Sequence, residues 1–170
     1  MAPPEVITQL RQIDFHAEGE YRDWRNTEYC HCTVKAIDMG VLPPSETDLN
    51  LWENKARAIL NRQKQLNINL CSIIQFPTAV VAKITSESLF SLHRELFKVL
   101  PSSQPSFEDA NYIPHISLIP LCKNTKIRID ENCDKLLSNI NFKVKEIQLV
   151  VWNIKDWTKT QIVSRFKLET

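Results

Sequence analysis

Apolar and polar residues alternate along the chain in two periods, one typical of helices and one typical of strands. Apolar residues at helical spacing predict helices over residues 4–13 and 45–63, the first beginning at Pro4 and the second at Ser45. A third helix carries Leu89, Leu92, Leu96 and Leu100 on one face and ends before Pro101, and a short fourth is expected near residues 130–139. Strands are expected over residues 29–37, 66–76, 79–84, 112–120, 142–152 and 158–168.

Each half of the chain therefore follows the order strand, helix, strand, strand. This order predicts an α+β fold in which two antiparallel sheets face one another. Lobe one is expected over about residues 1–85 and lobe two over about residues 86–170, with the chain free to cross between them. Because no long linker separates the halves, we expect a single domain of 170 residues.

The composition of the chain excludes several classes of function. The chain has 21 basic and 20 acidic side chains, which excludes a strongly basic nucleic-acid binder and an acidic tail protein. Its two glycines cannot build a dinucleotide-binding fingerprint or a P-loop. Five cysteines without C-x-x-C spacing argue against a disulfide framework and a structural zinc site. No apolar run is long enough to span a bilayer, and residues 1–12 do not resemble a signal peptide, so we expect a cytoplasmic protein.

Two tripeptides carry the candidate chemistry, H-C-T at residues 31–33 and H-I-S at residues 115–117. Alternate side chains of a strand point to one face, so His31 is expected to share a face with Thr33, and His115 with Ser117. If the two strands lie across a cleft, two imidazoles and two hydroxyls converge there.

This set of side chains suits phosphodiester cleavage. The reaction needs a base that activates the nucleophile and an acid that protonates the leaving oxygen, and two histidines can fill both roles near neutral pH. Hydroxyl groups can donate hydrogen bonds to the non-bridging phosphate oxygens. The set requires no metal, and two histidines without a carboxylate cluster make a poor zinc site.

The two H-x-[ST] motifs resemble the paired signatures of the 2H phosphoesterase superfamily, within its LigT-like group of 2′-5′ RNA ligases and cyclic phosphodiesterases. The first motif lies in HCTVKA, and FEDANYIPHISL resembles the lead-in to the second. FPTAVVAKI followed by SLHRELFKVL resembles the segment between them. The similarity runs from about residue 5 to the end. Such proteins usually open with an apolar strand before the first helix, whereas this sequence starts almost at that helix, so either an edge strand is absent or upstream residues have been lost.

The resemblance implies a bilobal, pseudo-two-fold-symmetric fold with both histidines in a central cleft and the helices outside. It also implies hydrolysis of 2′,3′-cyclic phosphates or 2′-5′ phosphodiester bonds without a metal or cofactor. His31 and His115 would be the acid–base pair, and Thr33 and Ser117 the phosphate-binding residues. Which histidine is the base stays open.

Four further residues are candidates for substrate binding. Lys35 has the strand parity of Thr33 and would either contact a phosphate or lie at the solvent rim. Tyr112 would pack, or reach the substrate and stack on a base through a bulge at Pro114. Trp152 is more simply a core residue than a base-stacking one. Arg165, in the last strand, could face a phosphate.

Other histidines and cysteines have simpler interpretations. His93 lies on the apolar face of its helix, which favours packing or capping, and His16 lies in a polar loop. Cys30 and Cys32 flank His31, but in a strand their thiols point away from its imidazole, so no metal site is expected.

The sequence therefore predicts a small monomeric phosphodiesterase whose substrate is an RNA end or a nucleotide with a cyclic phosphate. Two alternatives remain at this point. One is an RNA-end or nucleotide-binding module without turnover, and the other is 2′-5′ ligation by reversal of the hydrolysis.

Overall fold

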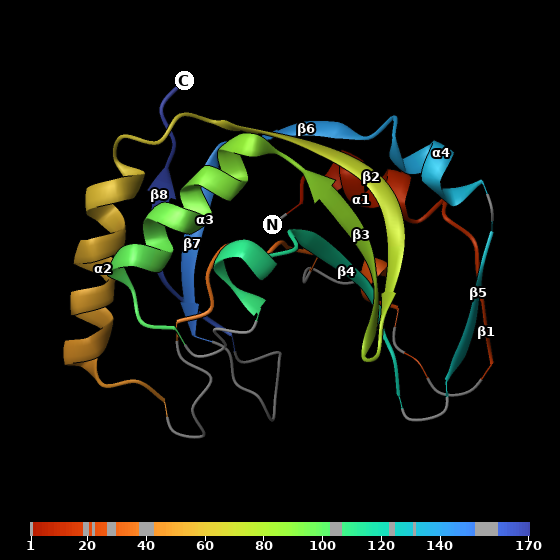
Figure 1. Ribbon diagram of the computed structural model, residues 1–170, viewed down its shortest axis with the longest axis horizontal. Coiled ribbons are helices and arrows are strands. Elements are labelled where there is room, and N and C mark those ends of the chain that lie inside the picture. Colours follow the sequence, from red (N-terminus) through yellow and green to blue (C-terminus); the bar gives the residue numbers. More distant parts are fainter. Residues whose placement is uncertain are drawn as a thin grey trace. The chain divides into compact units, whose positions relative to one another are not determined.

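The structure, a computed structural model, is shown in Figure 1. The residues that it describes are 2–18, 21, 23–26, 30–37, 43–102, 107–122, 125–130, 132–151 and 160–170. None of the helices among them is long and apolar enough to cross a membrane.

The described helices and strands follow one another in an order that mixes the two types throughout. They are α1 (Pro4–Leu10), β1 (Phe15–Glu18), the 3-10 helix η1 (Trp24–Asn26), α2 (Glu46–Leu60), β2 (Leu66–Phe76), β3 (Ala79–Thr85), α3 (Glu87–Val99), the 3-10 helix η3 (Asp109–Asn111), β4 (His115–Pro120), β5 (Lys126–Ile129), α4 (Cys133–Leu137), β6 (Asn141–Val144), β7 (Glu146–Val151) and β8 (Gln161–Lys167).

The chain forms two compact units, each built from three separate segments. Unit 1 consists of Met1–Thr33, Asn67–Glu87 and Ile113–Phe142, and unit 2 of Val34–Leu66, Ser88–Tyr112 and Lys143–Thr170. One of these divisions, between Glu87 and Ser88, falls close to the lobe boundary expected near residue 85, but each unit also contains segments from the other half of the chain. Strand pairing explains the difference, because β3 pairs with β4 although α3 and η3 lie between them in the sequence.

Antiparallel pairing joins β1 to β5, β2 to β3, β3 to β4 and β7 to β8. One sheet has the order β4-β3-β2-β6, and two smaller sheets pair β1 with β5 and β7 with β8. In Figure 1 the hairpin of β2 and β3 is long and strongly curved. Together with the helices, these sheets confirm the predicted α+β class.

The buried face of β4 forms part of the core of unit 1. Ile116 and Leu118 are at most 1% exposed, and Ile116 lies opposite Ala82 of β3, which is fully buried. Val6 and Leu10 of α1 are buried too. Burial of this face fixes which side of β4 turns outward, because neighbouring residues of a strand point to opposite faces.

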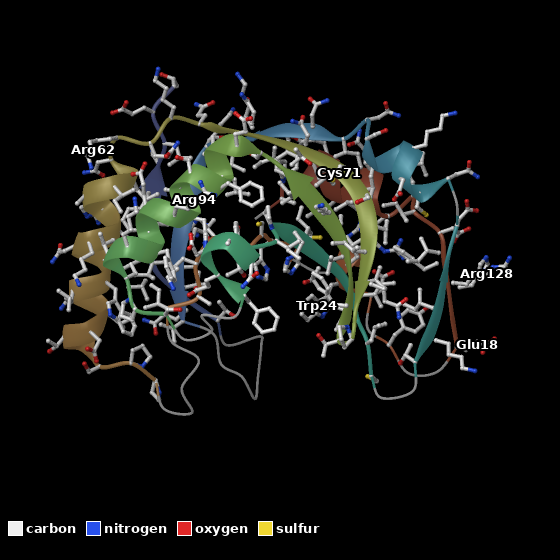
Figure 2. The ribbon with its side chains drawn as sticks, viewed as in Figure 1. Glu18, Trp24, Arg62, Cys71, Arg94 and Arg128 are labelled. Atoms are coloured by element: carbon white, nitrogen blue, oxygen red, sulfur yellow. The ribbon has the colours of Figure 1, made fainter. Side chains whose placement is uncertain are left out.

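Arg25 anchors the segment that leads toward the first histidine motif. Its Nη1 donates hydrogen bonds to the carbonyl oxygens of Leu10, the last residue of α1, and of Ile13. Its Nη2 lies 2.7 Å from Oδ2 of Asp23, and its guanidinium lies 4.6 Å from the centroid of the Phe15 ring. These contacts satisfy helix-terminal carbonyls that would otherwise lack partners. The 3-10 helix that contains Arg25 lies against β4, and Trp24 is labelled in Figure 2.

Most predicted elements are confirmed with shorter ends. The helix predicted over residues 4–13 is α1, the helix over 45–63 is α2, and the helix marked by Leu89 and Leu96 is α3. Ser45 caps α2, since its Oγ accepts a hydrogen bond from the Asp48 amide at 3.1 Å. The strands predicted over 66–76 and 79–84 are β2 and β3, and those over 112–120 and 158–168 begin three residues later, as β4 and β8.

The strand predicted over residues 29–37 is wrong for residues 30–37, which form neither helix nor strand. Their carbonyls accept isolated hydrogen bonds from other parts of the chain. The Cys30 oxygen accepts from the Ala2 amide at 2.8 Å, and the Val34 oxygen lies 2.7 Å from Nδ1 of His93. A segment with an alternating pattern forms a strand only where a neighbouring strand pairs with it through backbone hydrogen bonds. None of the described residues forms such a pairing with residues 30–37.

Two other predictions need correction. The single strand predicted over residues 142–152 is divided at Lys145, because β6 belongs to the sheet of β2 whereas β7 pairs with β8. The polar loop predicted around His16 is instead strand β1, since Phe15–Glu18 pairs with Lys126–Ile129. Strands of four residues carry too little alternation to be recognised from sequence.

Candidate functional site

His115 begins β4 and is half-buried. Its Nδ1 lies 2.7 Å from the backbone oxygen of Ile113. A carbonyl oxygen only accepts hydrogen bonds, so Nδ1 carries the proton in the neutral ring. The lone pair is then on Nε2, which can take up a proton from a substrate or return one. The Ile113 carbonyl thus sets both the tautomer and the orientation of the imidazole.

The outward face of β4 also carries Ser117. Ile116 between them is buried on the opposite face, and Ser117 is half-buried like His115. Residues 115–117 pair with β3 in continuous register, His115 opposite Lys83 and Ser117 opposite Val81. The prediction that His115 and Ser117 share a strand face is therefore confirmed.

The same face extends across β3 to β2. Lys83 lies opposite His115 on one side and opposite Ser72 on the other, so these three residues form a row across three strands. Directly opposite residues of antiparallel strands project to the same face of a sheet. We call Ser72, Lys83 and His115 the polar row. The sequence did not single out Lys83, because its position depends on the pairing of β3 with β4.

Phe76, near the end of β2, contacts the His115 ring. The two ring centroids are 5.3 Å apart and the planes are nearly perpendicular, at 84°. Two register shifts flank the polar row, one between Leu70 and Ser72 and one between Val80 and Val81. Bulges of this kind bend a strand and redirect its side chains, and they are frequent beside active sites. Cys71, the extra residue of the first shift, is labelled on β2 in Figure 2.

The first motif lies in the irregular segment that follows η1. His31 is half-buried, Thr33 is exposed, and both belong to unit 1 together with His115 and Ser117. The preceding residue, Cys30, is fully buried, and burial raises the pKa of its thiol to about 11, with the Asp23 carboxylate adding to the rise. Because residues 30–37 form no strand, alternation no longer supports a common face for His31 and Thr33. The meeting of the two imidazoles across a cleft stays a prediction.

Lys35 belongs to unit 2, and its side chain is buried. Its Nζ lies 2.6 Å from Oε1 of Glu108, and the two side chains are only 2% and 5% exposed. The same ammonium donates to the Ala36 carbonyl and lies 5.5 Å from the centroid of the Phe97 ring. Glu108 also accepts a hydrogen bond from Ser102. This geometry fits neither a phosphate ligand nor a rim lysine, and we assign Lys35 a structural role.

Tyr112 packs in the same unit against His93. Their rings are stacked, with centroids 3.9 Å apart, and Phe90 meets the tyrosine ring edge-on at 5.7 Å. His93 is 1% exposed, and its Nε2 accepts a hydrogen bond from the Asp109 amide at 2.9 Å. Nδ1 therefore carries the proton and donates to the Val34 carbonyl. These contacts support packing of Tyr112, its role in base stacking stays a prediction, and the packed interpretation of His93 is confirmed.

Arg165 and Trp152 are the other two residues that the sequence offered for substrate binding. Arg165 pairs with Glu146 at 2.9 Å on the surface of the β7–β8 sheet, and its side chain is 54% exposed. This carboxylate accepts hydrogen bonds from Gln148 and Arg165, which lower its pKa. Trp152 lies outside the described residues. Among the residues that the structure describes, no group of three or more His, Cys, Asp or Glu is placed to hold a metal ion.

Comparison with solved structures identifies the fold. The chain is similar to LigT of E. coli, with a TM-score of 0.55 and 17% sequence identity over 99% of this chain and 93% of that one. It is also similar to the protein TT0787 of Thermus thermophilus, with a TM-score of 0.52 and 13% identity over 96% and 88% of the two chains. No family model and no curated protein matches the sequence. The LigT-like fold predicted from the two histidine motifs is thus confirmed.

Proposed function

We propose that this chain is a metal-independent phosphodiesterase that hydrolyses 2′,3′-cyclic phosphate or 2′-5′ phosphodiester bonds of RNA ends or nucleotides. The observation that supports this most directly is the setting of His115. Its Nδ1 is bonded to the Ile113 carbonyl, which leaves Nε2 for proton transfer on the face that Ser117 shares. The first motif, His31-Cys32-Thr33, in the same compact unit and the LigT-like fold add to that support.

His31 and His115 would act as the acid–base pair. For a cyclic phosphate, one imidazole takes a proton from water while the water oxygen bonds to phosphorus. The bond from phosphorus to one ribose oxygen breaks, and the other imidazolium gives its proton to that oxygen. One water molecule is consumed, a phosphomonoester forms, and proton exchange with solvent restores both rings. Which histidine acts as the base depends on which ribose oxygen leaves.

Thr33 and Ser117 would hold the non-bridging phosphate oxygens. Negative charge builds on these oxygens in the transition state, and a preorganised hydroxyl donor stabilises it. Ser117 suits this role because it lies on the outward face of β4, two residues from His115. In this proposal the protein acts as a cytoplasmic monomer.

The test is hydrolysis of nucleoside 2′,3′-cyclic phosphates and 2′-5′ dinucleotides by the purified protein in the presence of a chelator. We expect His31→Ala and His115→Ala each to lower kcat by about 10²–10⁴, the usual loss when a general acid or base is removed. His16→Ala is the matched control, because His16 is exposed on β1 of the same unit. Equal rates for the wild type and both variants on every substrate would refute the assignment.

The RNA-end binding alternative predicts a different result. A non-catalytic module would bind nucleotide 2′- or 3′-phosphates without forming product, and its binding would survive the loss of one histidine. Titration of these ligands, followed through the histidine ring resonances, separates this outcome from hydrolysis. Ligation by reversal would appear as 2′-5′ bond formation at high product concentration.

A further inference from the structure

We propose that Lys83 binds a second phosphate, next to the one that is cleaved, so that the enzyme prefers an RNA oligonucleotide end to a free cyclic mononucleotide. This inference rests on the proposed function and specifies its substrate class. It follows from the polar row of Ser72, Lys83 and His115, which the strand register places on one face of the sheet.

The register fixes the distance between Lys83 and His115. Directly opposite residues in an antiparallel pair have Cβ atoms about 4.5–5.5 Å apart and project to the same side. Contact of the Phe76 ring with His115 supports the same orientation, because Phe76 is four residues from Ser72 on β2 and so has its parity. The lysine side chain therefore extends from the sheet beside the candidate catalytic imidazole.

Lys83 is exposed, in contrast to its neighbours Ala82 and Ile84, which are buried on the opposite face. No ion pair joins its ammonium to any residue that the structure describes. Lys35, a candidate from the sequence for phosphate binding, is instead paired with Glu108. Lys83 is thus a cation near His115 with no anion among the described residues to neutralise it.

The directions of Ser117 and Lys83 from His115 differ. Ser117 is displaced along β4, whereas Lys83 is displaced across the sheet toward β2. A phosphate between Nε2 of His115 and the Ser117 hydroxyl lies to one side of the lysine, whose flexible four-carbon stem can then reach a different anion. In a single-stranded RNA the next anion is the neighbouring phosphodiester. A cyclic mononucleotide has no such group.

The experiment compares two substrates that share the same cyclic end, a nucleoside 2′,3′-cyclic phosphate and an RNA of about ten nucleotides ending in that group. We expect Lys83→Gln to lower kcat/KM for the RNA by about fivefold, the upper range for an exposed ion pair, and by less than about twofold for the mononucleotide. Lys83→Arg should keep the preference for RNA. For the RNA, the slope of log kcat/KM against log salt concentration should fall by about 0.7, the value for one phosphate of a single strand.

Lys126→Gln is the matched control, since Lys126 is an exposed lysine of unit 1 in a different sheet. The Lys126→Gln variant should leave kcat/KM unchanged for both substrates. Equal losses on both substrates in Lys83→Gln would mean that Lys83 serves the scissile phosphate, and no loss on either would mean that it binds no phosphate. Both results overturn the inference and leave the proposed activity intact.

A wild type that cleaves neither substrate would instead refute the proposed function. Lys83 is then tested by binding alone, through fluorescence anisotropy of the same RNA ending in a 3′-phosphate, with a nucleoside 3′-phosphate as competitor. Weaker RNA binding by Lys83→Gln, with unchanged competition by the mononucleotide, would support the second phosphate site. Unchanged RNA binding would overturn it.

Discussion

Lys35 and Glu108 form a buried ion pair, with 2.6 Å between Nζ and Oε1, that joins the segment after the first histidine motif to the segment before the second. Val34 and Asp109 are next to this pair in the sequence, and both form hydrogen bonds with the imidazole of His93. The Val34 carbonyl accepts from Nδ1, and the Asp109 amide donates to Nε2. The pair and His93 therefore tie the same two segments together inside unit 2. Asp109 has a left-handed φ of 52°, a conformation that costs a residue with a side chain some stability.

Replacement of Lys35 by methionine should destabilise the protein strongly. Glu108 would keep its charge in a site where it is 5% exposed, with only the Ser102 hydroxyl as a remaining side-chain partner among the described residues. Breaking one side of a buried pair costs about 3–5 kcal/mol in the free energy of unfolding. For a protein of this size the melting temperature should fall by about 10 °C, measured by calorimetry.

The double variant Lys35→Met, Glu108→Leu is the control, because removal of both charges leaves no unpaired ion. It should recover a large part of the lost stability. An unchanged melting temperature in the single variant would show that the pair is not buried in solution.

The two hydrogen bonds of His93 can be removed one at a time. Asparagine at this position can still donate to the Val34 carbonyl, and glutamine can still accept from the Asp109 amide. Each variant leaves one buried backbone group without a partner, which costs about 1–3 kcal/mol. Urea unfolding should rank both variants between the wild type and His93→Ala. If the asparagine and glutamine variants are as unstable as the alanine variant, the imidazole acts by its shape alone.

Loss of the Ser117 hydroxyl should slow turnover more than it weakens binding. Under the proposed function, Ser117→Ala should lower kcat by about 10², because the missing donor contributes mainly in the transition state. KM should change little, which steady-state kinetics on a cyclic nucleotide would show. Ser138→Ala, at the end of α4, serves as the control, since the Ser138 hydroxyl donates to the Lys135 carbonyl within its own helix end. A kcat equal to that of the wild type would remove Ser117 from the mechanism.

The Cys30 thiol should make the protein less stable at high pH. Burial raises its pKa from 9.0 to about 11, so the folded state favours the neutral thiol. This contribution to stability is fully present below about pH 9 and is lost as the pH rises through 11. Iodoacetamide at about pH 8 should label the exposed Cys122 and leave Cys30 unmodified, as mass spectrometry would show. Labelling of Cys30 at the rate of Cys122 would contradict its burial.

The sequence predicts those parts of the structure that depend on local pattern. Helix α2 could be placed because Ser45 caps it and its apolar residues keep a helical period. The hairpin of β2 and β3 could be placed because Pro77 and Thr78 separate two apolar strands. The face shared by His115 and Ser117 followed from strand alternation alone.

Features that depend on distant partners could not be predicted in this way. Residues 30–37 have a strand-like pattern but form no strand. The Cys30 and Val34 carbonyls instead accept hydrogen bonds from the Ala2 amide and the His93 imidazole. Lys35 looked like a phosphate ligand because Glu108, its partner, is far away in the sequence. Lys83 was overlooked for the same reason, since only the pairing of β3 with β4 places it beside His115.

The interleaved make-up of the two units constrains how the protein can fold during synthesis. Unit 1 needs every segment up to Phe142 and unit 2 every segment up to Thr170, so neither can be completed while the first half of the chain alone has left the ribosome. Nascent chains that stop near residue 85 would expose the apolar sides of β2 and β3 without β4 to pair with them. Emergence of residues 113–142, rather than of an N-terminal half, is therefore the event that permits unit 1 to fold.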